Sequence, residues 1–310
     1  MKIEFKPAFI ERYEALTQFK EFKKESLTPL HKSIRVNTLK IQPKDLIKRM
    51  QPTWITKPIP WCKQGFFISH KDGRKDIGNT LESVLGYFHV QEASSMIPPL
   101  VLNPKPGDIV LDLCASPGSK TTQMAAMMNH KGLIIANDCK PDRIKALAIN
   151  LQKSGAQNVI TTLRDGNRFS GYKFDKILVD APCSGTGTIK KSLKTISIWN
   201  PGMVRRLAHI QKRLITTAFG NLKVGGTLVY STCSVEPEEN EGIIDYLLST
   251  QPNAQTMSIN LPLNQSPTIK EFNGTAYNSA VKESLRIWPQ DNHTCGFFIT
   301  KITKSSSIHV

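Results

Sequence analysis

The stretch Ile109-Val-Leu-Asp-Leu-Cys-Ala-Ser-Pro-Gly-Ser-Lys120 decides the fold class. It opens on an unbroken run of Val, Ile and Leu, which is typical of a strand buried on both faces of a parallel sheet. Asp112 closes this run, and Pro117 and Gly118 make a tight turn into a helix, whose free N–H groups can face a polar ligand. Neither GxGxxG nor GxxxxGKS/T is present, so the turn argues only weakly for a phosphate, and a plain βα turn is the alternative.

Outward from this stretch, strand-like runs alternate with amphipathic helical segments. The expected strands cover 109–114, 133–138, 159–165, 176–182, 227–234 and 297–302, and the expected helices cover 121–129, 141–155 and 203–223. This alternation predicts an open α/β sheet of largely parallel strands. Ligands of such sheets bind outside the carboxyl ends of the strands, so we expect the chemistry of this protein there.

The first hundred residues do not show this alternation of buried strands and helices. They contain a polar helix expected over 8–24, a basic strand-like segment at 33–40, a short helix at 43–50 and a strand at 65–69. We interpret residues 1–95 as a small α+β domain that precedes a larger α/β domain at 96–310.

The composition of the 310 residues limits the class of protein. Apolar residues make up 39% and charged residues 21%, as in ordinary globular proteins. No stretch approaches the roughly 20 uninterrupted apolar residues of a membrane span, and the N-terminal sequence carries charge too early for a secretory signal. The six cysteines show no CxxC pair and no zinc spacing. We therefore expect a cytoplasmic monomer with reduced thiols, no metal and no membrane segment.

Four successive expected strands end in a carboxylate, at Asp112, Asp138, Asp165 and Asp180. A single Asp at a strand end is more often a helix cap or a turn former. The fourfold repetition instead points to a nucleoside-bearing cofactor and a polar substrate, with Asp138 placed where an acidic residue commonly accepts the hydroxyls of a ribose. Because no diphosphate cradle is present, S-adenosylmethionine fits better than NAD.

Two cysteines, Cys183 and Cys233, also fall at the carboxyl ends of expected strands. A lone Cys is usually a small hydrophobic residue, and we interpret Cys62, Cys139 and Cys295 in this way. We expect Cys183 and Cys233 to react, because both lie beside the inferred cofactor. A free thiol has a pKa of about 8.5, so an attacking cysteine needs nearby positive charge.

The distribution of charge is uneven. Lys and Arg number 41 against 25 Asp and Glu, a net charge of +16 with a pI near 9.6, which favours a polyanionic partner over a featureless basic surface. The 55 residues between Asp180 and Glu236 hold no acid. We interpret this basic stretch as a track for a polynucleotide backbone that also favours thiolate, with a solvated basic face as the alternative. Its basic residues are Lys190, Lys191, Lys194, Arg205, Arg206, Lys212, Arg213 and Lys223, and the expected RNA contacts are Lys190, Lys191, Arg205, Arg206, Lys212 and Arg213.

Six motifs stand in order along the chain. They are VQEASSM (90–96), DLCASPGSKT (112–121), DAPCSGTGTI (180–189), STCSVEPEENE (231–241), RIWPQ (286–290) and GFFITK (296–301). Together they resemble a known family, the RNA (cytosine-5) methyltransferases of the RsmB/NOP (Sun-type) group. The match runs in the family's order from about Ile34 to Lys301, and the compact chain is most similar to the archaeal tRNA (cytosine-5) members.

The resemblance implies a class I methyltransferase fold, in which a seven-stranded Rossmann-like sheet has an antiparallel last strand. It also implies a small RNA-recognition-like domain in front, S-adenosylmethionine as cofactor and 5-methylcytosine in RNA as product. The cofactor-binding residues that it implies are Cys114, Ala115, Ser116, Pro117, Gly118, Ser119, Lys120, Asp138, Arg143, Asp165 and Asp180.

In the family, the cysteine of the TC motif is the nucleophile and the cysteine of the PC motif assists product release. These roles map to Cys233 and Cys183, and Asp180 lies between the cofactor and the base. Carbon 5 of cytosine is a poor nucleophile, so the thiolate first adds to carbon 6 and makes an enamine that attacks the sulfonium methyl group. Asp180 is suited to hydrogen-bond the exocyclic amine and the ring nitrogen of the base.

The chain departs from the family's pattern at two places. Ser119 stands where the family usually has glycine, and we expect it to be tolerated as a helix-start residue provided that φ is not positive there. Residues 291–295 also differ, so we assign them no catalytic role.

The choice of substrate leaves alternatives open. We favour tRNA over rRNA, because about a hundred residues precede the expected catalytic domain, fewer than in the bacterial rRNA members. The same chemistry on rRNA is the main alternative. A catalytically silent RNA-binding homologue and a small-molecule methyltransferase are two others.

Overall fold

The larger part of the protein is an open sheet with the strand order β10-β14-β9-β8-β5-β6-β7, and β13 pairs with β14 outside this path. Strands β5 to β9 run parallel, whereas β14 is antiparallel to its neighbours β9 and β10. The structure is a computed structural model that describes residues 4–306. The Rossmann-like sheet with an antiparallel last strand is therefore confirmed. Its strands are β5 (Ile109–Asp112), β6 (Leu133–Asp138), β7 (Val159–Leu163), β8 (Phe174–Asp180), β9 (Leu222–Thr232), β10 (Ala254–Met257), β13 (Leu285–Ile287) and β14 (Phe297–Lys304).

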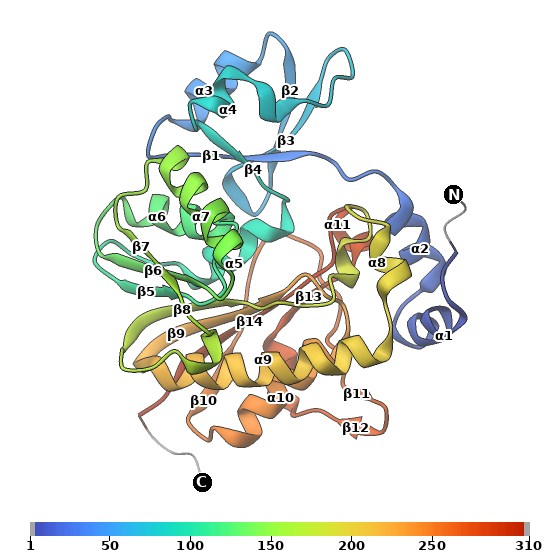
Figure 1. Ribbon diagram of the computed structural model, residues 1–310. Coiled ribbons are helices and arrows are strands. Elements are labelled where there is room, and N and C mark those ends of the chain that lie inside the picture. The colour runs from blue at the N-terminus through green and yellow to red at the C-terminus, as the bar shows by residue number, and fades with distance from the viewer. Residues whose placement is uncertain (1–3, 307–310) are drawn as a thin grey trace.

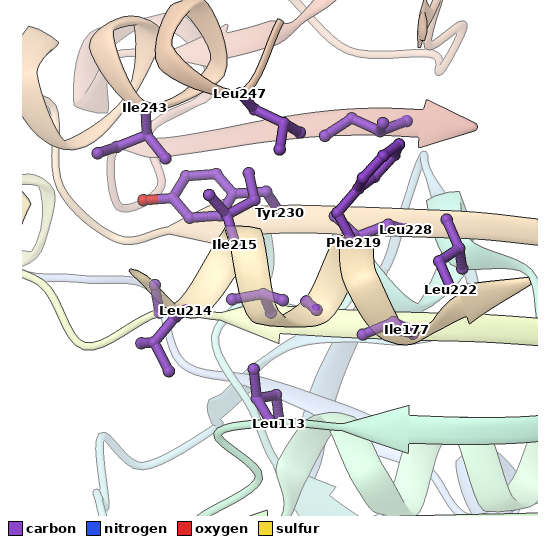
Figure 2. Close-up of a cluster of buried hydrophobic side chains, with 14 of the residues drawn as sticks. Leu113, Ile177, Leu214, Ile215, Phe219, Leu222, Leu228, Tyr230, Ile243 and Leu247 are labelled. Atoms are coloured by element: carbon purple, nitrogen blue, oxygen red, sulfur yellow. The ribbon is translucent and has the colours of Figure 1, made fainter. Parts of the chain in front are cut away.

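Helices cover both faces of this sheet (Figure 1). One face is covered by α5 (Ile97–Leu102), α6 (Ser119–Met128) and α7 (Pro141–Ser154). The other face is covered by α9 (Pro201–Asn221) and α10 (Glu241–Thr250). Figure 2 shows the second face, where Ile215 and Phe219 of α9 and Ile243 of α10 pack around Tyr230 of β9. The strands are thus buried on both sides, as their unalternated Val, Ile and Leu content predicts.

A second, antiparallel sheet has the strand order β2-β3-β1-β4. Its core contains Ile34, Leu46, Trp54 and Phe88. Together with its helices it forms the small α+β unit that was expected before the larger sheet. Its elements are β1 (Ser33–Val36), α3 (Pro43–Met50), β2 (Trp54–Ile59), β3 (Cys62–His70), α4 (Leu81–Val84) and β4 (Phe88–Val90).

One buried cation joins the small sheet to the larger one. Arg35 of β1 donates to the carbonyl oxygen of Ser119 at 2.6 Å and to the hydroxyl of Thr122 at 3.0 Å, both in the first turns of α6. Burial lowers the pKa of Arg35 to about 9. The start of α6, which belongs to the expected cofactor loop, is therefore held from the small domain.

The helix expected over 8–24 is two helices, α1 (Pro7–Leu16) and α2 (Phe19–Leu27), separated by the extended residue Thr17. In one straight helix, Phe22 would lie nine residues from Tyr13 and on the opposite face, at about 100° per residue. The break lets Tyr13 and Phe22 stack at 4.9 Å and pack with Trp288. Both helices thereby pack on the larger domain although they precede the small sheet. The boundary at residue 95 stays a prediction.

The remaining elements are short. A hairpin of β11 (Glu271–Phe272) and β12 (Thr275–Ala276) lies near the start of α9 and α10 in Figure 1. Two further helices, α8 (Lys194–Ile198) and α11 (Pro289–Asn292), lie on the side of the molecule where α1 and α2 pack. Within residues 4–306, no helix has the length and apolar character that crossing a membrane requires.

Candidate active site

Two cysteine thiols meet at the carboxyl edge of the sheet. Asp180 of β8 is the register partner of Ser231 of β9, so Cys183, three residues after β8, lies beside Cys233, which directly follows β9. The two Sγ atoms are 3.4 Å apart, within hydrogen-bond distance for sulfur. The two cysteines that the sequence singles out are therefore neighbours in space, although 49 residues separate them in the chain.

The surroundings of the pair distinguish its two thiols. With Cys183 as donor, the hydrogen bond lowers the pKa of Cys233 and raises the pKa of Cys183. Burial and Asp180 oppose the shift at Cys233, whereas the cations of Lys120 and Lys191 add to it. Cys233 is thus the member of the pair that is set up to carry the thiolate, which is the reactive form.

Asp180 forms an ion pair at the same edge. Its Oδ2 accepts from Lys120 Nζ at 2.6 Å, and its Oδ1 accepts from the hydroxyl of Ser231 at 2.8 Å. Lys120 also donates to the hydroxyl of Ser95 at 3.0 Å. Burial acts to lower the pKa of Lys120, but attraction to Asp180 raises it above its usual range, so the ammonium stays charged beside the thiols.

A cavity of about 240 Å³ opens at the ends of β5 and β8. Its walls are the loop 114–120, residues 90–95 of the small domain, and the side chains of Asp112, Asp180 and Lys191. Both domains thus contribute to it, and the loop that the sequence assigns to the cofactor forms one side.

The residues around this cavity fit S-adenosylmethionine. Asp112 Oδ2 accepts from the Thr121 hydroxyl at 2.8 Å, but its buried Oδ1 has no hydrogen-bond partner among the described residues. Burial raises the pKa of Asp112 to about 7. A buried carboxylate oxygen at a cavity wall suits a ligand ammonium, such as the amino group of this cofactor. Asp138 ends β6, is 4% exposed and lies 3.3 Å from Arg143 Nε, but it does not line this cavity, so its contact with a ribose stays a prediction.

In the predicted cofactor set, the loop residues Gly118 and Ser119 have the expected backbone conformation, whereas Asp165 does not stand where the sequence predicts. Gly118 has φ of 104°, and Ser119 begins α6 without positive φ, so the serine is tolerated there as expected. Asp165 lies two residues beyond the end of β7 at Leu163, not at the strand end. Its half-exposed carboxylate caps the short helix Gly166–Arg168 by accepting from Asn167 N. A role for Asp165 in cofactor binding stays a prediction.

The basic stretch is not one continuous track. Lys190 is buried and forms an ion pair with Glu25 of α2, so it does not offer a free charge to a phosphate. Lys223 pairs with Asp175 at the opposite, amino edge of the sheet, because it stands at the start of β9. The interpretation of the whole stretch as one track that also favours thiolate is therefore wrong for Lys223, which lies at the far edge, while an RNA contact of Lys190 stays a prediction.

The other predicted RNA contacts remain accessible. Lys191 lines the cavity beside Asp180. Arg205, Arg206 and Arg213 are exposed on α9, and Lys212 of the same helix packs over the ring of Tyr246 at 5.0 Å. The accessible basic side chains thus divide between the active-site cavity and the outer face of α9.

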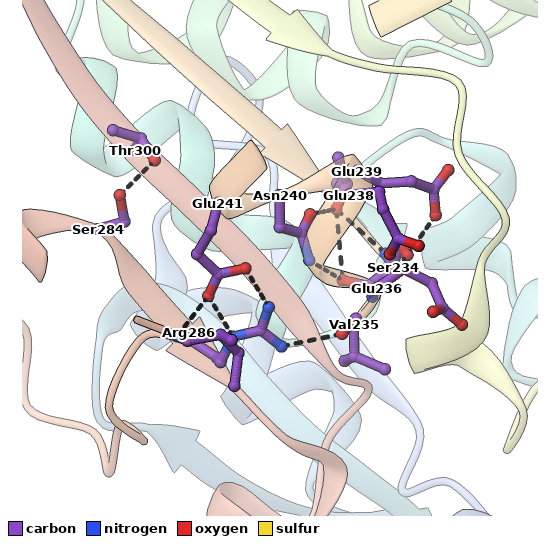
Figure 3. Close-up of polar contacts among 12 residues, drawn as sticks. Ser234, Val235, Glu236, Glu238, Glu239, Asn240, Glu241, Ser284, Arg286 and Thr300 are labelled. Carbon is purple, nitrogen blue, oxygen red and sulfur yellow. Dashed lines mark hydrogen bonds and ion pairs between the residues drawn. The ribbon is translucent and has the colours of Figure 1, made fainter. Parts of the chain in front are cut away.

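Sequence reasoning missed the function of the acidic segment 236–241, in which three of the four glutamates are fully buried (Figure 3). Glu236 accepts from Tyr13 and Trp199, and Glu241 forms an ion pair with Arg286 in which neither side chain is exposed. Glu239 accepts from the residue after each reactive cysteine. A run of acids after a cysteine carries no signal for these partners, since all of them except Ser234 lie far away in the chain.

A metal centre has no candidate in the part of the chain that the structure describes, since no three His, Cys, Asp or Glu side chains gather there as ligands would.

Comparison with known proteins places the chain in a family. Residues 99–303 match the family described as 16S rRNA methyltransferase RsmB/F, and residues 5–93 match the N-terminal domain of 16S rRNA methyltransferase RsmF. The chain is 45% identical to a tRNA (cytosine(49)-C(5))-methyltransferase of Pyrococcus abyssi, over 95% of each chain. It is 44% identical to the ribosomal RNA small subunit methyltransferase F of Shewanella oneidensis, over 93% of this chain but only 60% of that protein.

A solved structure agrees with this placement. The methyltransferase homologue from Pyrococcus horikoshii superposes with a TM-score of 0.83 at 34% identity, over 96% of this chain and 99% of that one. The resemblance in the sequence motifs is confirmed. The chain therefore belongs to the RsmB/F family of S-adenosylmethionine-dependent RNA (cytosine-5) methyltransferases.

Proposed function

We propose that this enzyme forms 5-methylcytosine in tRNA, with Cys233 as the nucleophile and Cys183 as the group that assists release. The observation that carries the two roles is the 3.4 Å contact between the thiols, in which the pKa of Cys233 is lowered and the pKa of Cys183 is raised. Only one thiol of such a pair is ready to attack. The other stays protonated while Cys233 attacks.

The order of events follows from this asymmetry. The Cys233 thiolate adds to carbon 6 of the cytosine, and the electron pair of the 5,6 double bond moves toward carbon 5. Asp180, held by Lys120 and Ser231, hydrogen-bonds the edge of the base toward which charge shifts. Bound S-adenosylmethionine supplies the electrophilic methyl group that carbon 5 takes.

Release requires the opposite electron flow. The carbon 5 proton leaves, the 5,6 double bond forms again and the bond from carbon 6 to Cys233 Sγ breaks. The negative charge of Cys233 contributes to the raised pKa of Cys183. Once Cys233 is a thioether, that charge is gone, so Cys183 gives its proton to solvent more easily and its thiolate can take the carbon 5 proton.

The relative from Pyrococcus abyssi, which matches over 95% of both chains, supports tRNA as the substrate class. The rRNA enzyme from Shewanella oneidensis supports the alternative, but this chain spans about 60% of it. Cytoplasmic location and a monomeric state stay predictions from the sequence.

The substrate proposal is tested by methyl transfer from labelled S-adenosylmethionine to purified tRNA and to 16S rRNA, followed by bisulfite sequencing of the products. We expect label in tRNA at one or a few cytosines. Label in rRNA alone would replace tRNA by rRNA, and no label in either RNA would favour a silent RNA-binding homologue.

RNA binding gives a separate prediction for α9. Exchanging both Arg205 and Arg206 for Glu should weaken tRNA binding roughly tenfold or more and lower the slope of log Kd against log salt by about 1 to 2, since each phosphate contact contributes about 0.7 to 0.9. Filter binding from about 50 to 200 mM salt measures both quantities. Neither arginine lines the cofactor cavity, so the affinity for S-adenosylmethionine should not change.

Lys223→Glu is the matched control for the single exchanges Arg205→Glu and Arg206→Glu, because it reverses one charge at the amino edge of the sheet. Equal losses of RNA affinity in the control and in the single α9 variants would show that net charge alone, and not the position of the arginines, governs binding.

A further inference from the structure

Glu239 lies next to the two turns that carry the reactive cysteines, the turn after β8 with Cys183 and the turn after β9 with Cys233. It forms hydrogen bonds to these turns and not to the thiols. It ends the short helix Pro237–Glu239 and has no exposed surface. Its Oε1 accepts from Ser184 N at 2.9 Å, and its Oε2 accepts from the hydroxyls of Ser184 and Ser234. Ser184 follows Cys183 and Ser234 follows Cys233. One carboxylate therefore holds the residue next to each reactive thiol (Figure 3 shows its contact with Ser234).

The carboxylate is itself held from two sides. Gln211 of α9 donates to Glu239 Oε1 at 3.0 Å and also to the carbonyl oxygen of Pro182 at 2.9 Å. The hydroxyl of Tyr230, in β9, donates to the backbone oxygen of Glu239 at 2.6 Å. Glu239 thus cannot move without breaking contacts to a strand and a helix of the larger domain.

The donors around Glu239 require two acceptor oxygens. Burial raises its pKa to about 7, and the hydrogen bonds from Ser184 and Ser234 act against that rise. An amide at this position would offer one acceptor oxygen and an NH₂ group, so the hydroxyls of Ser184 and Ser234 would have to turn and accept where they now donate. The hydrogen bonds that join the two turns to this side chain would then rearrange.

We propose that Glu239 is a positioning residue for the cysteine pair. Its carboxylate sets the separation of the two turns, and so keeps the Cys183 thiol within hydrogen-bond distance of Cys233. The inference rests on the proposed roles of the two cysteines, because it assigns to Glu239 the geometry that makes one of them the better nucleophile. Sulfur hydrogen bonds are weak and depend on distance, so a small displacement is enough to lose this one.

The test is the pH profile of Cys233 alkylation by iodoacetamide in the free enzyme, read by mass spectrometry of the Cys233 peptide. Glu239→Gln should raise the pH midpoint by about one unit and slow alkylation at pH 7 by up to about tenfold, because the thiolate is the reacting form. Glu238→Gln is the matched control. Its carboxylate contacts Arg12 and neither cysteine turn, so its midpoint should equal that of the wild type.

A second set of variants keeps the carboxylate and removes its two hydroxyl donors, while Ser184 N and Gln211 still donate to it. Ser184→Ala and Ser234→Ala should each raise the midpoint by a smaller amount, and the double variant should approach Glu239→Gln. If Glu239→Gln does not fold, the serine variants decide the question. A midpoint within about 0.2 units of the wild type in Glu239→Gln, or in the double serine variant, would overturn the proposal.

Alkylation needs neither RNA nor methyl donor, so this test is independent of the substrate. A raised midpoint without methyl transfer to any RNA would count against the proposed function only. A merely structural role for Glu239 would lower the stability of the fold in thermal unfolding and leave the midpoint unchanged.

Discussion

Cys233→Ala should abolish methyl transfer to RNA and the covalent enzyme–RNA adduct that precedes it. Without this thiolate, nothing adds to carbon 6, so carbon 5 never becomes nucleophilic enough to take the methyl group. Loss of a catalytic nucleophile lowers turnover by on the order of 10⁴-fold or more. Incorporation of labelled methyl groups measures turnover. RNA that contains 5-fluorocytosine measures the adduct on denaturing gels, because fluorine at carbon 5 cannot leave as a proton does.

The exposed thiol of Cys139, which does not line the cavity, offers a matched control. Cys139→Ala should keep turnover within about twofold of the wild type, as surface substitutions usually do. An adduct that persists in Cys233→Ala at the wild-type level would exclude Cys233 as the nucleophile.

Cys183→Ala has the opposite expected phenotype, because it removes the group that assists elimination and leaves the attacking thiolate in place. The enzyme should methylate once and then remain covalently bound to RNA. Turnover should fall to about one methyl group per enzyme, and a band of enzyme plus RNA should survive denaturation. Quantifying that band against total enzyme gives the trapped fraction.

The structure adds a pH dependence to this prediction. Cys183 is the hydrogen-bond donor that lowers the pKa of Cys233. In Cys183→Ala this lowering is lost, the thiolate fraction at neutral pH falls, and trapping should be slower at pH 7 than at pH 8.5. The wild-type adduct should form with a smaller difference between these two pH values.

The double variant Cys183→Ala/Cys233→Ala is the control for the trapped species and should form none. If the single variant Cys183→Ala loses the adduct at both pH values, the roles of the two cysteines are reversed.

Much of the sheet was predictable because its pattern is local. Uninterrupted Val, Ile and Leu runs mark strands buried on both faces, and β6 begins and ends where the sequence predicts. Asp112, Asp138 and Asp180 are strand ends in the structure too. By contrast, the short strands β4 and β10 were missed, since three or four residues such as Phe88–Val90 carry too little pattern to stand out.

By itself, the sequence determined the alternation of the longer strands and helices in the larger domain, the family, and the cysteines and carboxylates that stand at strand ends. These features depend on periodicity and on motifs within a few residues. Only the tertiary structure decided which charges are available. Lys190 is occupied by Glu25, 165 positions away, and Lys223 lies at the far edge, although both belong to the same basic stretch. Likewise, the contacts of Glu239 with Ser184 and Ser234 exist only because β8 and β9 bring these two serines to one carboxylate. Burial and pairing depend on residues far apart in the chain, which no local pattern encodes.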